Sequence, residues 1–282
     1  MPQIQEVIVL FDEFGTPSFK DTTSSGNFLG VSALYTANNE VKIFRSLGTS
    51  MGLSNSQPVK NNRITKNRAN KIASQVSLNN LYITARYLDL NNEQLEETSI
   101  NYLNVSNLGR KIFRGVKERK DVHLLHSQIL LSCVFDNIVR FLDCNDGDNY
   151  RFYIFIDSFS YPKSDSYIVL DYCSENLQKH VQKFQDESIN NKNVFIEPLE
   201  FFTKSMVKRE RLIDCLNSII SRSILDSKSD KYDLEPRNII QQGLDKRFSF
   251  QDITNDTIIF LHESLYDDIQ STKIEDKSLI IV

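Results

Sequence analysis

Three aspartates that lie far apart in the sequence each follow or interrupt an apolar segment. Asp12 ends the run Val7-Ile-Val-Leu-Phe, Asp157 follows Arg151-Phe-Tyr-Ile-Phe-Ile, and Asp214 lies within Leu212-Ile-Asp-Cys-Leu. Carboxylates that converge from separate elements are the ligands that Mg²⁺ and Mn²⁺ prefer, and two such ions about 4 Å apart can stabilise the attacking and leaving oxygens of a phosphodiester. The sequence therefore predicts a shared metal site. The alternative is that Asp12 and Asp157 belong to turns and Asp214 to a solvated helix face.

Two glutamates are candidates for a further acid at this site. Glu13 follows Asp12, so on an extended strand it points to the opposite face of the sheet. Gly15 would allow the chain to turn and return Glu13 to the site. Glu210 precedes Asp214 by four residues and shares its helical face. We rank both glutamates below the three aspartates.

The helix expected at residues 122–142 carries further polar candidates. His123 and His126 stand three residues apart near its start and could bind metal or transfer protons, or could pack at the surface. His126 lies nearer the apolar stripe and is the better candidate. Asp136 lies among apolar neighbours, and we expect it on the exposed edge of the helix.

The basic residues are segregated along the chain. Residues 41–88 contain no acid but eight basic residues, whereas residues 225–282 contain 12 acids against 7 basic residues. Such segregation is compatible with a surface for a phosphate backbone, or with ordinary solvated faces. Lys204 and Lys208 precede the Asp214 helix and could reach a phosphate at its N-terminus. The nucleic-acid-binding candidates are Lys60, Arg63, Lys66, Arg68, Lys71, Lys204 and Lys208.

The pattern of apolar residues predicts a mixed α/β fold. Strands are expected at 5–11, 27–35, 41–47, 81–90, 151–156 and 193–197, and helices at 63–77, 122–142, 166–184 and 208–225. Residues 48–62 are expected to form a loop. An early antiparallel meander followed by crossover units is the order of a ribonuclease-H-like sheet flanked by helices. We expect this domain to occupy residues 1–225 and residues 226–282 to be a small accessory segment.

Three short motifs resemble the domain of unknown function 3800 family. They are Ile8-Val-Leu-Phe-Asp-Glu-Phe-Gly followed by Phe28-Leu-Gly-Val, then Phe155-Ile-Asp157, and finally the segment from Thr203 to Leu216. The resemblance implies a ribonuclease-H-like fold with a metal-dependent acidic site, often in bacterial mobile-element and phage-defence settings. Phe14 stands where the family usually has Ser, and Ile213 where it usually has Ala.

The remaining features bound the function. There is no glycine-rich phosphate loop and no nucleophile motif, so a nucleotide-handling enzyme ranks last. No 18-residue apolar run or basic leader is visible, and four scattered cysteines suggest reduced thiols, so we expect a cytoplasmic protein without membrane contact. The leading hypothesis is a metal-dependent nuclease whose partner is nucleic acid. The alternative is an inactive nucleic-acid- or protein-binding subunit of a defence complex.

Overall fold

The computed structural model describes most of the chain. The described residues are 4–15, 28–36, 66–78, 81–106, 120–157, 163–187, 192–202, 213–214, 216–217, 219–221 and 235–265.

The centre of the fold is a mixed sheet in the order β5-β4-β1-β2-β3-β7, with β6 also paired to β4. β1, β2 and β3 pair antiparallel, whereas β4 pairs parallel to β1, and β7 pairs parallel to β3. The sheet therefore joins an N-terminal meander to strands that return by crossovers. The strands are β1 (Gln5–Gly15), β2 (Phe28–Thr36), β3 (Leu81–Asp89), β4 (Asn149–Ile156), β5 (Asn193–Ile196), β6 (Glu200–Phe201) and β7 (Phe248–Asp252).

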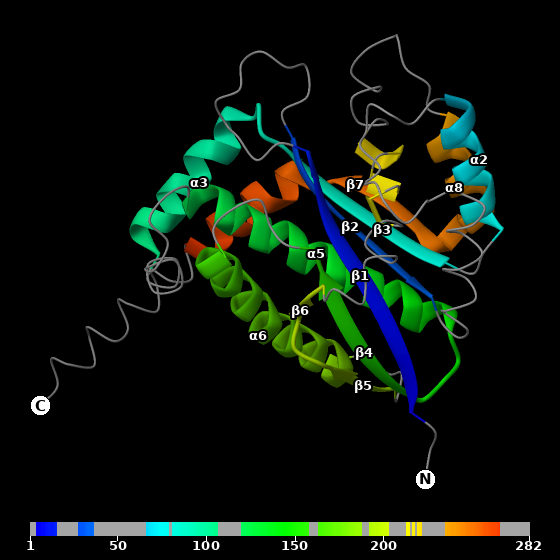
Figure 1. Ribbon diagram of the computed structural model, residues 1–282. Helices are drawn as coiled ribbons and strands as arrows, with labels where there is room; N and C mark the ends of the chain where they lie inside the picture. Colours follow the sequence, from blue (N-terminus) through cyan, green and yellow to red (C-terminus); the bar gives the residue numbers. More distant parts are fainter. Residues whose placement is uncertain are drawn as a thin grey trace, which may run out of the picture.

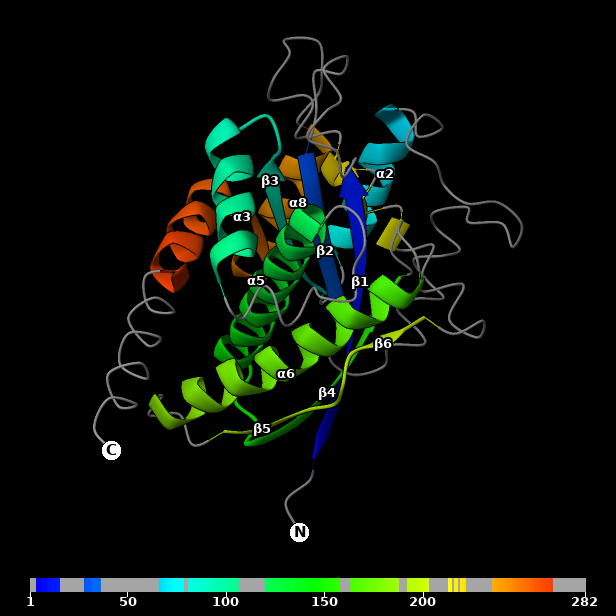
Figure 2. The same cartoon turned by 90° about the vertical axis from the view of Figure 1, so that its left-hand side faces the viewer.

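Helices cover both faces of this sheet (Figure 1). α5 (Lys120–Cys144) crosses one face and packs against α6 (Lys163–Glu187) and α3 (Glu93–Val105). α2 (Lys66–Ser77) and α8 (Glu235–Leu244) pack together on the other face, and the helical residues Ile213, Leu216, Ile219 and Ile220 belong to the same core. Residues 254–265 form a further helix after β7. Figure 2 shows the long helices α5 and α6 from the side.

β1 is buried on both faces, which explains its unbroken apolar run. Val7, Val9 and Phe11 belong to the core beneath α5, whereas Leu10 and Phe14 belong to the core on the α2 side. Successive side chains of a strand point to opposite faces, so a central strand needs apolar residues at nearly every position. Phe14 packs tightly over Gly30, where an added Cβ would lie 2.1 Å from its ring.

α5 is the main core helix. It is long and apolar enough to cross a membrane by length and composition alone, but 67% of that stretch is buried inside the protein. The C-terminal carbonyls of a helix lack partners within the helix, and Lys192 supplies one here. Its ammonium donates to the carbonyl oxygens of Leu142 and Asn145. This contact connects the end of α5 to the start of β5, because Lys192 directly precedes Asn193.

The α/β, ribonuclease-H-like architecture agrees with the sequence-based prediction. Strands at 5–11, 27–35, 81–90 and 151–156 and helices at 63–77, 122–142 and 166–184 are confirmed with small shifts of their bounds. The predicted strand 41–47 and loop 48–62 lie outside the described residues. α3 was not predicted, although Asn92 caps it by accepting from the Leu95 N–H at 3.1 Å and two glutamates follow in its first turn.

The division at residue 225 does not separate two cores. β7 extends the sheet by pairing with β3, and Ile240, Leu244 and Phe248 belong to the core on the α2 side. Ile253 and Leu261 belong to the core beneath α5. Residues 235–265 are therefore part of the main fold and not an accessory segment. The sequence did not reveal this because the pairing partner of β7 lies over 150 residues earlier.

Candidate metal centre

The parallel pairing of β1 and β4 brings two of the predicted aspartates together. Phe11 lies opposite Ile156, and the Asp157 N–H donates to the Phe11 carbonyl at 3.0 Å. Asp12, within β1, and Asp157, directly after β4, therefore lie at the same level of the sheet, where β4 ends. Ligand sites of α/β sheets form at this edge, outside the carboxyl ends of parallel strands.

The third aspartate comes from the helical residues packed against the sheet. Ile213, Leu216 and Ile220 are buried in the same core as Leu10, which fixes this segment on the sheet. Asp214 is thereby directed at the edge, and ligand oxygens of Asp12, Asp157 and Asp214 lie within 4.8 Å of one another. The predicted convergence of the three aspartates is confirmed.

The charge balance of this cluster is unfavourable without a cation. Asp12 is 6% exposed. Burial raises the pKa of Asp12 well above its usual range, and the nearby Asp214 and Asp157 carboxylates raise the pKa further. A divalent cation would relieve this repulsion, and an all-carboxylate oxygen set suits a hard cation. The three aspartates could therefore hold a metal ion.

Asn217 is a site residue that the sequence did not single out. Its side-chain amide donates to Asp12 Oδ2 at 2.6 Å and, at 3.3 Å, to the Glu13 carbonyl. This bond lowers the pKa of Asp12, against the effects of burial and like charge. The available signal was spacing, because Asn217 follows Asp214 by three residues and so shares its helical face.

Glu13 lies on the opposite face of the sheet, as its place after Asp12 predicted. Its Oε2 lies 3.6 Å from Nε2 of His126 on α5. Burial and, to a lesser extent, the nearby His123 together lower the pKa of His126 to about 3, so the ring is neutral near pH 7. Glu13 and His126 therefore form a buried contact beneath α5 and are not part of the aspartate cluster.

The other polar candidates on α5 make separate contacts. His123 Nε2 lies 3.6 Å from Asp165 Oδ2 near the start of α6. Asp136 pairs with Arg86 at 2.8 Å and with Arg140 at 2.7 Å. Asp136 is thus on the partly exposed side of α5, as expected, but it holds a buried arginine in place.

The structure describes few of the predicted nucleic-acid contacts. Lys71 is exposed on α2. Lys66 and Arg68 lie on the same helix, but their side chains are outside the described part of the structure. The candidates outside the described residues are Lys60, Arg63, Lys204, Lys208 and Glu210.

Comparison of the sequence with protein-family models and with curated protein sequences found no match. The resemblance to the domain of unknown function 3800 family therefore stays a prediction, and the function is argued from the geometry of the site.

Proposed function

We propose that this protein hydrolyses phosphodiester bonds of nucleic acid with Mg²⁺ or Mn²⁺ held by Asp12, Asp157 and Asp214. The observation that carries the proposal is the convergence of three carboxylates within 4.8 Å at the carboxyl edge of a ribonuclease-H-like sheet. Bound Mg²⁺ or Mn²⁺ supplies Lewis-acid stabilisation of phosphoryl oxygens and activates water as the nucleophile.

The chain's own residues prepare this centre. Asn217 donates to Oδ2 of Asp12 and so holds this carboxylate in one orientation. The backbone bond between Asp157 and Phe11 fixes the second carboxylate relative to the first. Asp214 approaches from a helix whose apolar residues are buried, so its position follows from packing. Ligands held on rigid elements in this way favour a defined ion geometry.

The finer features of the proposal follow from the sequence. Substrate would be drawn by the basic, acid-free stretch of residues 41–88, of which Lys71 is exposed on α2. We place the protein in the cytoplasm, and its resemblance to the domain of unknown function 3800 family favours a role in bacterial phage defence. A protein partner within such a system would act as trigger.

A second candidate is an inactive subunit that binds nucleic acid or a protein partner on the same fold. The position of Glu13 favours this second candidate. Its side chain faces α5, so among the described residues the site contains three carboxylates and not four. In this case the aspartate cluster would bind a cation for structure and not for hydrolysis.

The test is cleavage of labelled single-stranded RNA, single-stranded DNA and an RNA–DNA hybrid, with Mn²⁺ and with EDTA. We would compare wild type with Asp157→Asn and, as a matched control, with Asp171→Asn on the exposed side of α6. Cleavage that needs metal and is lost only in Asp157→Asn supports the nuclease. Binding of a substrate without cleavage, unchanged in Asp157→Asn, supports the inactive subunit.

A further inference from the structure

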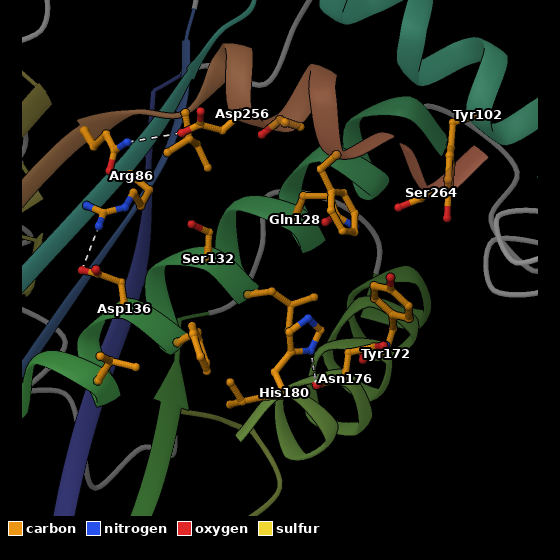
Figure 3. Close-up of a pocket in the computed structure, with 18 residues that line it drawn as sticks. Arg86, Tyr102, Gln128, Ser132, Asp136, Tyr172, Asn176, His180, Asp256 and Ser264 are labelled. Atoms are coloured by element: carbon orange, nitrogen blue, oxygen red, sulfur yellow. Dashed lines mark hydrogen bonds and ion pairs between the residues drawn. The ribbon is translucent and has the colours of Figure 1, made fainter. Parts of the chain in front are cut away.

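A cavity lies on the face of the sheet opposite to the metal centre. It has a volume of about 560 Å³ and opens between α5, α6 and the helix of residues 254–265 (Figure 3). Arg86 lines it and lies opposite Val31, which in turn lies opposite Glu13. Directly paired residues share a face of the sheet, so the cavity is on the Glu13 side and Asp12 on the other. The two sites are separated by the sheet.

The size and the walls of this cavity suit a small ring compound. Its volume falls within the range of pockets that enclose small ligands, roughly 300–1,000 Å³. Aromatic side chains from four different segments line it, and aliphatic side chains fill the gaps between them. Flat aromatic walls favour a flat partner that can stack or meet them edge-on. The aromatic lining residues are Tyr102, Phe135, Tyr172 and Phe260.

The single arginine of the cavity is fully engaged by the protein. Arg86 is 3% exposed, and its Nη2 contacts Asp136 Oδ2 at 2.8 Å. Its Nη1 donates to the Ala85 carbonyl at 3.0 Å and to Ser249 Oγ at 2.9 Å. Asp136 neutralises its charge, so an anionic group entering the cavity would find no cation that is not already paired.

The groups left to a ligand are mainly acceptors. In the described part of the chain, every contact of the Asp136 carboxylate reaches Oδ2, so Oδ1 keeps its lone pairs. Asp256 likewise uses only Oδ2, in a bond from Gln251 at 3.3 Å. Nδ1 of His180 donates to the Asn176 carbonyl at 2.7 Å, which leaves Nε2 as the ring nitrogen that a ligand can reach.

Hydroxyl groups of the lining add to these acceptors, among them those of Ser132 and Tyr172. Ser132 lies between the Arg86–Asp136 pair and His180, and its hydroxyl points into the cavity (Figure 3). Burial raises the pKa of Tyr172 to about 12, so its hydroxyl stays protonated at neutral pH and bonds with Gln128. The lining thus carries two carboxylates against one paired arginine, together with hydroxyl and amide groups.

We propose that this cavity binds an amino-substituted aromatic heterocycle without phosphate, such as a nucleobase or nucleoside. The aromatic walls would hold the ring, and the free carboxylate oxygens of Asp136 and Asp256 would accept from its amino and ring N–H groups. The excess of carboxylates disfavours a phosphate in the cavity. The site does not depend on the metal centre. The ring comes either from a free nucleoside or from an unpaired base of a strand.

The test is a binding measurement on the full chain in EDTA, by calorimetry and ligand-observed NMR. The probes are adenosine, cytidine and guanosine, their 5′-monophosphates, short single-stranded oligonucleotides, and toluene as an apolar ring without donors. Ser132→Phe would place a ring in the cavity between the Arg86–Asp136 pair and His180, and Asp256→Asn would remove one acceptor charge. Glu263→Gln, an exposed acid on the same helix but outside the cavity, is the matched control. Thermal unfolding verifies that each variant is folded.

We expect at least one nucleoside to bind with one-to-one stoichiometry and more tightly than its monophosphate. Binding should disappear in Ser132→Phe, weaken about threefold to tenfold in Asp256→Asn, and stay unchanged in Glu263→Gln. Binding of oligonucleotides alone, with the same response to the variants, would identify a strand as the source of the base. Binding of toluene alone, of no probe, or of nucleosides equally by folded Ser132→Phe would overturn the proposal.

Discussion

Replacing Asp12 by Asn should make the metal-free protein more stable. The substitution keeps the size of the side chain and an oxygen that can accept from Asn217, but it removes a buried charge beside two others. At 4.8 Å two unit charges repel by about 0.9 kcal/mol at the dielectric constant of water and by about 3.5 kcal/mol at an effective value of 20. We expect Asp12→Asn to raise the free energy of unfolding by about 1–3 kcal/mol at pH 7 in EDTA.

The effect should depend on pH with a definite sign. Because the folded protein raises the pKa of Asp12, the carboxyl is neutral in both states below about pH 4, and the two proteins should then be equally stable. As the pH rises towards the folded-state pKa, the unfolded chain has lost a proton that the folded chain retains. The stability of wild type relative to Asp12→Asn should therefore fall with increasing pH and then level off.

Metal should reverse the order of stabilities. An ion that binds only the folded state at 1,000 times its dissociation constant stabilises it by about 4.1 kcal/mol, which exceeds the advantage expected for Asp12→Asn. The free energy of unfolding of wild type should rise by about this amount with Mn²⁺, whereas that of Asp12→Asn should rise little. The measurement is urea unfolding at pH 4 and pH 7, with EDTA and with Mn²⁺, with Asp171→Asn as the control. If Asp12→Asn is less stable than wild type in EDTA at pH 7, the repulsive-cluster argument is refuted.

Three further substitutions test other contacts. Asn217→Ala removes the 2.6 Å bond to Asp12 and should weaken Mn²⁺ binding about tenfold by titration, whereas unchanged affinity would mean that the bond does not orient the ligand. Asp136→Ala leaves Arg86 buried without its carboxylate and should cost about 3 kcal/mol in urea unfolding; a loss below about 0.5 kcal/mol would contradict the buried pair. Since burial lowers the pKa of His126 to about 3, wild type should lose up to about 1.4 kcal/mol per pH unit from this ring between pH 6.5 and 3. His126→Gln should show a shallower acid loss, and an identical slope would mean that the ring is protonated in the folded state.

The sequence predicted the strands that carry the site because their signals are local. The apolar run up to Phe11 marks a strand buried on both faces, and strict alternation on β1 places Asp12 and Glu13 on opposite faces. Convergence of Asp12 and Asp157 followed from the assumption that β1 and β4 are neighbours, and that of Asp214 from the assumption that its helix packs on the sheet; the structure confirms both.

The parts that the sequence did not predict depend on tertiary contacts. Asn217 became a site residue only because its helix packs on the edge where Asp12 lies, and a polar residue at that spacing has no distinctive local signal. β7 is a short strand of five residues whose partner is remote in sequence, so neither its length nor its periodicity marks it as part of the main sheet. The cavity beneath the sheet arises where α5, α6 and the last described helix meet, and no single segment encodes it.

The separation of Asp12 and Asn217 along the chain also determines when the site can form during protein synthesis. The two residues are 205 positions apart, so Asp12 is synthesised well before Asn217. At roughly 5–20 residues per second, about 10–40 s pass before the ribosome has added Asn217. During that interval the nascent chain carries the acid of β1 without the helix that completes the cluster, and β3 lacks its outer neighbour until β7 is made. The complete cluster, with Asn217 bound to Asp12, therefore forms only after at least 205 further residues have been added to the chain beyond Asp12.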